Sequence, residues 1–418
     1  MSDNEKNVPK RRFKEFENAE AWEQRKLKQL ANFAKGQGYS KNDLTDVGTP
    51  IILYGRLYTK YQSIISEVDT FAVPQSGSVY STGEEVIVPA SGETAEDIAR
   101  ASAIVKSGFL LGGDLNIIYP NKDISTVFLA LSISNGKQQK ELSKRAQGKS
   151  VVHLHNSDLE NVTISFPCRD EQERIGSVFE HIDNLITLYQ RKLEKMKSLK
   201  KAYLTEMFPA EGERKPKLRF AGFTDDWEQH KFSDYYKICS GYAFKYQDYT
   251  EDGVAIVNGE SIQHGKVDST KFNYLPASFK LEYANFILKE GDIVVGLNRP
   301  ITDGKLKIAR IPNHLDDSLL YQRAGKIQYI NDVSADFSFV LLEKEILKHT
   351  LKEAVGSDQP FISTSKLERW KMLLPKSSDE QYKIGTYFKN LDNLITLHQH
   401  KLEKLQNIKK AYLNEMFI

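Results

Sequence analysis

The chain has little cysteine and no long apolar run. Cys168 and Cys239 are its only cysteines among 418 residues, too few for a disulfide framework and typical of a reducing compartment. No segment approaches the roughly 20 consecutive apolar residues that a membrane-spanning helix needs. The first residues, Met1–Lys6, lack the basic patch and apolar stretch of a secretory signal. We therefore expect a cytoplasmic protein.

The chain also lacks a net charge of either sign. It carries 58 Lys and Arg against 56 Asp and Glu, a formal charge of +2. An overall basic character, which often marks nucleic-acid binders, is missing, so any such function has to depend on local patches. With 40% hydrophobic residues, the length is sufficient for two cores.

Catalytic motifs are missing as well. Gly148–Ser150 has the ending of a phosphate-binding loop, but Ser143 stands where that loop requires glycine. The His-x-His pairs at 153–155 and 398–400 have no further ligands at metal-binding spacing. The chain contains no Pro-Pro, which excludes the Asn/Asp-Pro-Pro-aromatic methyltransferase motif. We predict no catalytic residue and no metal site.

What the sequence does contain is an internal repeat. Residues 170–208 and 379–417 align at an offset of 209 with 25 of 39 positions identical. A weaker repeat precedes this segment, because 148–167 matches 356–375 at an offset of 208. Repeats of this kind are the first feature to establish, since they determine the whole architecture.

The two halves also begin alike. Pro-Lys-x-Arg-Phe occurs at 9–13 and again at 216–220, and Trp-Glu-Gln occurs at 22–24 and 227–229. Between these borders, over about 27–147 and 232–355, the copies share no convincing identity. We call the repeated segments the frame and the divergent segments, about 27–147 and 232–355, the fillings. The frame therefore performs one task twice, and the two fillings perform two different tasks.

Each copy of the 39-residue repeat predicts one long amphipathic helix. Apolar residues recur at i, i+3 or i+4, and i+7 over more than five turns, and Pro209 ends the first helix. At about 1.5 Å per residue each helix is roughly 58 Å long. We expect the two to pair as an antiparallel intramolecular coiled coil, because a pseudo-twofold would place the fillings at opposite ends. The alternative is that each helix is only part of its own domain's core.

Both fillings predict compact α+β domains with twisted, mixed or mostly antiparallel sheets. Strands are expected at 49–54, 85–89, 115–119, 254–257, 291–295 and 305–311, and helices at 125–139 and 335–352. The predicted segments are 1–21 (N-terminal), 22–169 (first domain), 170–208 (first long helix), 209–226 (linker), 227–378 (second domain) and 379–418 (second long helix).

Each filling contains one run of positive charge. Residues 137–149 carry five cations to one anion, and 299–310 carry four to one. Such runs suit contact with phosphates, especially beside glycines that let a ligand approach the backbone. A solvated helix or loop face is the alternative.

The repeated motifs together resemble the specificity subunit of type I restriction-modification systems. The segments that carry the resemblance are Asp-Glu-Gln-x-x-Ile-Gly, Leu-Asp-Asn-Leu-Ile-Thr-Leu, Lys-Lys-Ala-Tyr-Leu-x-Glu-Met-Phe and Trp-Glu-Gln-x-Lys, each present twice, and Gly-Ser-Asp-Gln-Pro-Phe-Ile-Ser at 356–363. They stand in the order that the family has, and the resemblance covers essentially the whole chain.

The resemblance implies two target-recognition domains, each of which reads one half of a bipartite, asymmetric site in double-stranded DNA. The paired helices would set the spacer. The subunit itself would be no enzyme and hold no cofactor. Two methyltransferase subunits would methylate adenine N6 with S-adenosylmethionine, and two restriction subunits, where present, would use ATP and Mg.

Residue type alone suggests the contact residues, because Arg and Lys suit guanine and phosphate whereas Asn and Gln suit adenine. The candidates for DNA contact are Arg56, Tyr58, Lys60, Thr94, Lys144, Arg145, Lys149, Ser150, Tyr242, Lys245, Asn298, Arg299, Lys305, Lys307, Ser357 and Gln359. The candidates for docking methyltransferase helices are Tyr203, Met207, Phe208, Tyr412, Met416 and Phe417. For each of these residues an ordinary surface role is the alternative.

Two other functions stay open at this point. The chain could be a scaffold whose coiled coil joins two peptide- or sugar-binding domains, which would then have no affinity for DNA. It could also be an enzyme with an unrecognised site, which would modify or cut DNA without partners. The sequence leaves open whether the subunit binds DNA by itself.

Overall fold

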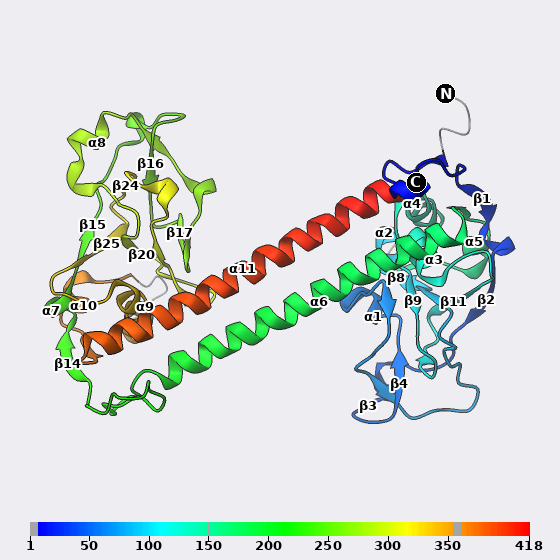
Figure 1. The fold of residues 1–418 in the computed structure, drawn as a ribbon, viewed down its shortest axis with the longest axis horizontal. Helices are drawn as coiled ribbons and strands as arrows, with labels where there is room; N and C mark the ends of the chain where they lie inside the picture. Colours follow the sequence, from blue (N-terminus) through cyan, green and yellow to red (C-terminus); the bar gives the residue numbers. More distant parts are fainter. Residues whose placement is uncertain (1–6, 147, 149–150, 354–360) are drawn as a thin grey trace. The chain divides into compact units, whose positions relative to one another are not determined.

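A computed structural model describes residues 7–146, 148, 151–353 and 361–418. The chain divides into two compact units (Figure 1). Unit 1 combines residues 1–192 with 398–418, and unit 2 is residues 193–397. Both long helices are therefore shared between units, whereas the sequence-based division kept each helix as a separate segment.

Unit 1 contains two larger sheets, and both mix parallel and antiparallel pairs. The five-stranded sheet has the order β2 (Ala31–Lys35), β11 (Leu115–Pro120), β7 (Val86–Pro89), β9 (Ser102–Ile104) and β5 (Ile64–Ile65). The four-stranded sheet has the order β10 (Leu110–Leu111), β4 (Thr49–Ile52), β6 (Phe71–Ala72) and β3 (Leu44–Thr45). Two further pairs are β1 (Glu23–Lys26) with β13 (Thr163–Phe166), and β8 (Ser91–Gly92) with β12 (Val152–His153).

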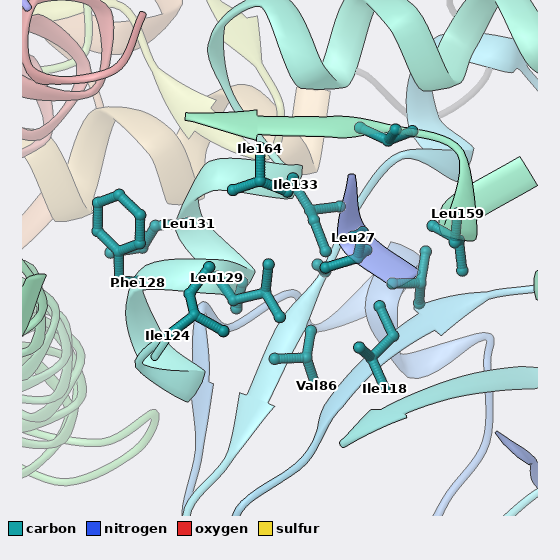
Figure 2. Packing of buried hydrophobic residues seen from close by; sticks show 14 of the residues in the cluster. Leu27, Val86, Ile118, Ile124, Phe128, Leu129, Leu131, Ile133, Leu159 and Ile164 are labelled. Carbon is teal, nitrogen blue, oxygen red and sulfur yellow. The ribbon is translucent and has the colours of Figure 1, made fainter. Parts of the chain in front are cut away.

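The helices of unit 1 complete its core. They are α1 (Arg56–Thr59), α2 (Ala95–Ile98), α3 (Thr126–Ile133), α4 (Gly136–Arg145) and α5 (Asn156–Glu160). Most of α3 is buried, and Figure 2 shows its side chains Phe128, Leu129, Leu131 and Ile133 among core residues such as Ile118. A helix that is apolar on every side is stable only when it is covered all round.

One sequence expectation about unit 1 is wrong. The segment 125–139 is not one helix, because α3 ends at Ile133 and α4 begins at Gly136. Gly136 adopts φ +68°, a left-handed conformation that a continuous right-handed helix does not allow. The apolar first part and the charged second part therefore form two helices.

Unit 2 has the same kind of architecture with different strands. Its antiparallel four-stranded sheet has the order β15 (Tyr236–Ser240), β25 (Ala324–Tyr329), β20 (Ile293–Gly296) and β23 (Ile308–Arg310). A three-stranded sheet has the order β19 (Tyr274–Leu275), β16 (Val254–Val257) and β24 (Leu319–Leu320). The two-stranded pairs are β14 (Glu228–Lys231) with β26 (Lys371–Leu374), β17 (Ile262–Gln263) with β18 (Lys266–Val267), and β21 (Ile301–Thr302) with β22 (Lys305–Leu306).

The helices of unit 2 are α7 (Phe232–Tyr235), α8 (Phe279–Glu282), α9 (Ala335–Glu353) and α10 (Thr364–Glu368). The expected strand at 305–311 is divided in two, because β22 and β23 are separated at Lys307 and pair with different strands. Both fillings thus have the expected α+β fold with mixed and antiparallel sheets. Short 3-10 turns lie at Lys14–Phe16, Leu27–Gln29, Lys41–Asp43, Tyr246–Asp248, Ser269–Lys271, Ala284–Phe286 and Asn313–Leu315.

The two long helices are α6 (Arg169–Glu206) and α11 (Ser378–Met416), as the repeat predicted (Figure 1). In unit 1, Asp183 of α6 forms an ion pair with Lys409 of α11 at 2.5 Å. In unit 2, Lys200 of α6 pairs with Asp392 of α11 at 2.8 Å. Residue numbers rise along one helix as they fall along the other, so the helices run antiparallel. The two ion pairs are equivalent under the offset of 209.

The repeated borders anchor each long helix at its start. Arg12 binds both carboxylate oxygens of Glu171, at 2.8 and 2.6 Å, and Arg219 binds those of Glu380 at 2.6 and 2.8 Å. Both glutamate side chains are about 1% exposed. These bidentate pairs explain why Pro-Lys-x-Arg and Asp-Glu-Gln occur together in each half.

Gln172, the next residue of the same motif, connects the start of the helix to its domain through hydrogen bonds. The side-chain amide of Gln172 donates to the carbonyl of Pro167, and its oxygen accepts from the backbone N–H of Ser125. Gln381 makes the equivalent bond to Pro375 at 3.2 Å. The repeat therefore encodes the contact between each long helix and its domain.

Among the helices described, none is long and apolar enough to cross a membrane.

Candidate nucleic-acid interface

The structure ties the candidates on α1 into internal contacts. Arg56 pairs with Asp69 at 2.6 Å, and Lys60 also contacts Asp69. Hydrogen bonds from Lys60 and then Arg56 lower the pKa of Asp69 to about 2. The hydroxyl of Tyr58 donates to the carbonyl of Ser91 at 2.8 Å. These side chains organise the loop, and Asp69 offsets one of the two positive charges.

Thr94 also has a local role. Its hydroxyl oxygen accepts from the backbone N–H of Asp97 at 3.1 Å, and its hydroxyl donates to the carboxylate of Asp97 at 2.8 Å. Thr94 is therefore the N-cap of α2. The sequence contained the signal for this role, because Thr94-x-x-Asp97 has the spacing of a capping box.

The basic run of unit 1 forms one exposed face of α4. Lys137, Lys140 and Lys144 are exposed and follow i, i+3, i+7 spacing, while Gln138 and Leu142 are buried on the other side. Arg145 differs from them, because it pairs with Glu141 at 2.7 Å. Lys149 and Ser150 lie outside the described residues.

A small cleft in unit 1 is formed where three loops meet. Its volume is about 360 Å³, and its lining residues are Gly38, Tyr39, Leu53, Tyr54, Gly112, Gly113 and Asp114. No sequence motif joins this group, because its members are distant in sequence. The local signals were the glycines in 36–38 and 112–114, which are typical of turns.

The basic run of unit 2 follows β20 and forms a hairpin. Asn298 and Arg299 are exposed, and Asn298 makes a β-bridge with Phe361, whose exposed fraction is 65%. Arg299 has φ +45°, which is unusual for a residue with a long side chain. A backbone strained in this way is common at functional sites.

Three cations gather beside this hairpin. Lys305 is exposed next to the turn residue Gly304, and Lys307 is half-buried. Burial lowers the pKa of Lys307; the charge of Glu260 raises it, and the charges of Lys271 and Arg299 lower it. Lys271 was not among the sequence candidates. A group of mutually repelling cations suits an anionic ligand.

The remaining candidates of unit 2 lie near an aromatic cluster. Tyr242 is 40% exposed, and its ring contacts those of Phe244, Tyr283 and Phe286 at centroid distances of 5.2, 4.6 and 5.5 Å. Lys245 is exposed beside this cluster. Ser357 and Gln359 lie outside the described residues.

The structure corrects the expected docking residues at the ends of the long helices. Met207 and Phe208 are 5% and 2% exposed in the core of unit 2, and Met416 and Phe417 are 2% and 6% exposed in the core of unit 1. They are apolar because they anchor helix ends inside the domains, and they form no exposed surface. Tyr203 and Tyr412 are half-buried against the same cores.

Exposed apolar side chains occur instead along the middle of the helices. Leu188 is 44% exposed and Leu397 is 47% exposed, and these two positions are equivalent under the offset of 209. In unit 1, a cleft of about 920 Å³ is lined by Leu188, by Arg56 and by Lys409, among other residues. The sequence signal was present, because both leucines belong to the repeated Leu-Ile-Thr-Leu.

No group of three or more His, Cys, Asp or Glu side chains within the described ranges is arranged to hold a metal ion. The surfaces that stand out are therefore basic, aromatic or apolar.

Comparison with known proteins identifies a family. The type I restriction modification DNA specificity domain matches the chain twice, over residues 19–198 and 224–407. The chain is 30% identical over 314 residues to the type I restriction enzyme MjaVIII specificity subunit of Methanocaldococcus jannaschii, covering 74% of this chain and 73% of that protein. It is 31% identical over 159 residues to the type I restriction enzyme EcoAI specificity subunit of Escherichia coli, covering 38% of this chain and 27% of that protein.

A solved structure shares the fold of the whole chain. It is the S subunit of the type I restriction-modification system of M. genitalium, with a TM-score of 0.66 and 16% sequence identity. The match covers 98% of this chain and 99% of that chain.

Proposed function

The chain belongs to the type I restriction modification DNA specificity family, and from this premise we propose that its two units read the two halves of one bipartite, asymmetric DNA site. The general role of the family, DNA sequence specificity without catalysis of its own, applies to this chain. The division of the site into two halves, the spacer and the residues that contact DNA are the proposal.

The observation that carries the proposal is the contrast between frame and filling. The two copies of the frame make the same contacts between equivalent atoms in the Arg–Glu pairs and in the Asp–Lys pairs. The fillings differ in strand order and in the groups that they expose. A symmetric frame with two unlike readers recognises an asymmetric sequence.

The exposed groups of the two units supply different kinds of contact. In unit 1, the lysine face of α4 suits phosphates, which position a protein on DNA without reading its sequence. In unit 2, Asn298 and Arg299 stand on a strained loop, and these residue types pair with adenine and guanine edges. Lys271, Lys305 and Lys307 supply positive charge beside them.

The paired helices set the spacer in this proposal. With 38 and 39 residues they are each about 57 to 59 Å long. Half-sites on one face of DNA are separated by about 34–36 Å or its multiples, one helical turn. A helix pair of this length suits a spacer on that scale.

The partners in the proposal are two methyltransferase subunits, which carry S-adenosylmethionine and methylate adenine N6. Two restriction subunits that use ATP and Mg complete the restriction complex. Each unit contributes its own candidate docking surface, around Leu188 in unit 1 and around Leu397 in unit 2, because both leucines are exposed at equivalent positions. This assignment replaces the buried helix ends.

Methylome sequencing tests the function directly. Cells that express this chain with its methyltransferase are compared with cells that express the methyltransferase alone. We expect a bipartite N6-methyladenine motif only in the presence of this chain. A stable complex that adds no methylated motif would contradict the proposal and favour a scaffold.

A further inference from the structure

The cleft of unit 1 that contains Asp114 lies where connections between strands converge. Gly38 and Tyr39 follow β2, Leu53 and Tyr54 follow β4, and 112–114 connects β10 with β11. Three strand connections therefore converge on one cleft of about 360 Å³. Loops held by a rigid sheet are where binding residues concentrate.

The backbone around the cleft is packed too closely for other residues. A side chain at Gly36 would place its Cβ 1.9 Å from the carbonyl oxygen of Gly112, and one at Gly112 would meet Leu53 at 2.7 Å. Tyr39 has φ +59°, although an aromatic residue rarely adopts a left-handed conformation. Close packing and backbone strain occur together at this cleft, and strained backbone clusters at sites that bind ligands.

Both tyrosines contact residues around the cleft. The ring of Tyr54 stands edge-on to that of Tyr58 at 6.3 Å, and Tyr58 is held by its hydrogen bond to Ser91. The hydroxyl of Tyr39 accepts from the backbone N–H of Gln75 at 2.8 Å. Tyr54 is still 39% exposed. An exposed ring on a fixed support is suited to an apolar contact with a base edge in a groove of DNA.

Asp114 supplies the polar group of the cleft. It is exposed, and it forms no ion pair with any other residue that the structure describes. An ionised carboxylate is only an acceptor, so it favours a base edge that presents an amino group. In the major groove, Asp and Glu pair with N4 of cytosine.

We propose that this cleft reads one base of the half-site recognised by unit 1, with Asp114 accepting from the amino group of cytosine in the major groove and Tyr54 making an apolar contact with the edge of the same base pair. The inference rests on the proposed DNA-reading function. The carboxylate disfavours guanine and thymine, because O6 or O4 would set two acceptors against each other without a proton between them. Adenine also presents an amino group at N6, but its acceptor N7 lies beside that group and repels the second carboxylate oxygen.

The test uses the assembled methyltransferase complex and Asp114→Asn, which keeps the size of the side chain and removes its charge. Methylome sequencing should show one cytosine position of one half-site relaxed to several bases, with the other half-site and the spacer unchanged. With duplexes that carry each base pair at that position, discrimination should fall about 5- to 150-fold, as for loss of one good base contact.

Asp46→Asn is the matched control, because Asp46 is exposed in the same unit and does not line the cleft. It should leave the motif unchanged. Tyr54→Ala provides a second variant and should slow methylation without admitting another base at the cytosine position, because it removes an apolar contact and keeps the hydrogen bond of Asp114.

The outcomes separate this inference from the broader function. If the wild-type complex and the Asp114→Asn complex methylate the same motif, the cleft assignment is overturned and the DNA-reading function stays intact. Loss of the methyltransferase from the complex in Asp114→Asn would overturn it too, because the cleft would then bind a protein. A wild-type chain without any motif would remove the premise itself.

Discussion

At the scale of single residues, the two Arg–Glu pairs are the contacts on which each half most depends. Glu171 and Glu380 are almost fully buried, and each is bound by two guanidinium N–H groups. A buried carboxylate is tolerated only while it is paired, because its transfer from water is costly. Removal of the arginine leaves that charge without compensation.

Arg219→Ala should therefore destabilise unit 2 by about 3–5 kcal/mol, the usual cost of breaking a buried pair. Chemical denaturation of the purified chain measures this loss. Arg11→Ala is the control, because Arg11 pairs with Glu415 at the surface, where its side chain is 51% exposed. Its transition should coincide with that of the wild type. Equal losses for the two variants would contradict our account of the buried pair.

His349 predicts a pH dependence in unit 2. It is 2% exposed, its ring meets Trp370 at 5.2 Å, and burial lowers its pKa below the ordinary 6.5. The unfolded chain thus takes up a proton more readily than the folded one. The contribution of His349 to stability should be constant above about pH 6.5 and fall below it by up to about 1.4 kcal/mol per pH unit.

Denaturation at pH 7.5 and pH 5.5 measures this effect. In His349→Phe, which keeps an aromatic ring against Trp370, the additional loss at pH 5.5 should disappear. If wild type and variant lose the same stability on acidification, another group is responsible.

At the scale of elements, each long helix carries a glycine where it crosses its domain. Gly176 and Gly385 are equivalent residues of the repeated Ile-Gly. A Cβ at Gly385 would lie 2.4 Å from the backbone nitrogen of Phe337 at the start of α9, whereas one at Gly176 would lie 3.2 Å from a methyl group of Val127. The same motif therefore packs against backbone in one half and against a movable side chain in the other.

Gly385→Ala should cost about 1–3 kcal/mol, because the helix has to move away from α9. Gly176→Ala should cost clearly less, because Val127 can shift and alanine favours the helix by up to about 1 kcal/mol. Thermal unfolding of the two variants compares them directly. An equal effect would mean that the crossings are alike despite the different contacts.

The elements were predictable where periodicity decides them. The long helices followed from their apolar spacing, and most strands from short apolar runs. The break between α3 and α4 did not, because Gly136 acts through a backbone conformation and not through hydropathy. The roles of Arg56 and Lys60 were hidden as well, since their partner Asp69 lies 9 to 13 residues away in an irregular loop.

At the scale of the whole molecule, the repeat predicted two similar halves and two antiparallel helices. It did not predict which core receives the end of each helix. Phe208 of the first half is buried in unit 2, and Phe417 of the second is buried in unit 1. From the sequence we expected methyltransferase helices to cover these apolar ends. A pattern of hydrophobic residues shows that a surface is covered, but it does not show what covers it.

The proposed role of the helices predicts the effect of lengthening both. Seven residues inserted in each helix, where Tyr189 contacts His398 at 5.5 Å, add about 10 Å at 1.5 Å per residue. The methylated motif should keep both half-sites and gain about three base pairs of spacer at roughly 3.4 Å each. Methylome sequencing determines both. A changed half-site with an unchanged spacer would contradict the role of the helices.

The division of the chain into units also has a consequence for its synthesis. Unit 2 is one continuous segment, 193–397, but unit 1 needs residues 398–418, which include Met416 and Phe417 of its core. The ribosome therefore starts unit 1 first and supplies its last core residues at the end. At roughly 5–20 residues per second, the first domain waits about 11 to 45 s for the 226 residues that follow Lys192. The domain begun second can thus complete its fold first.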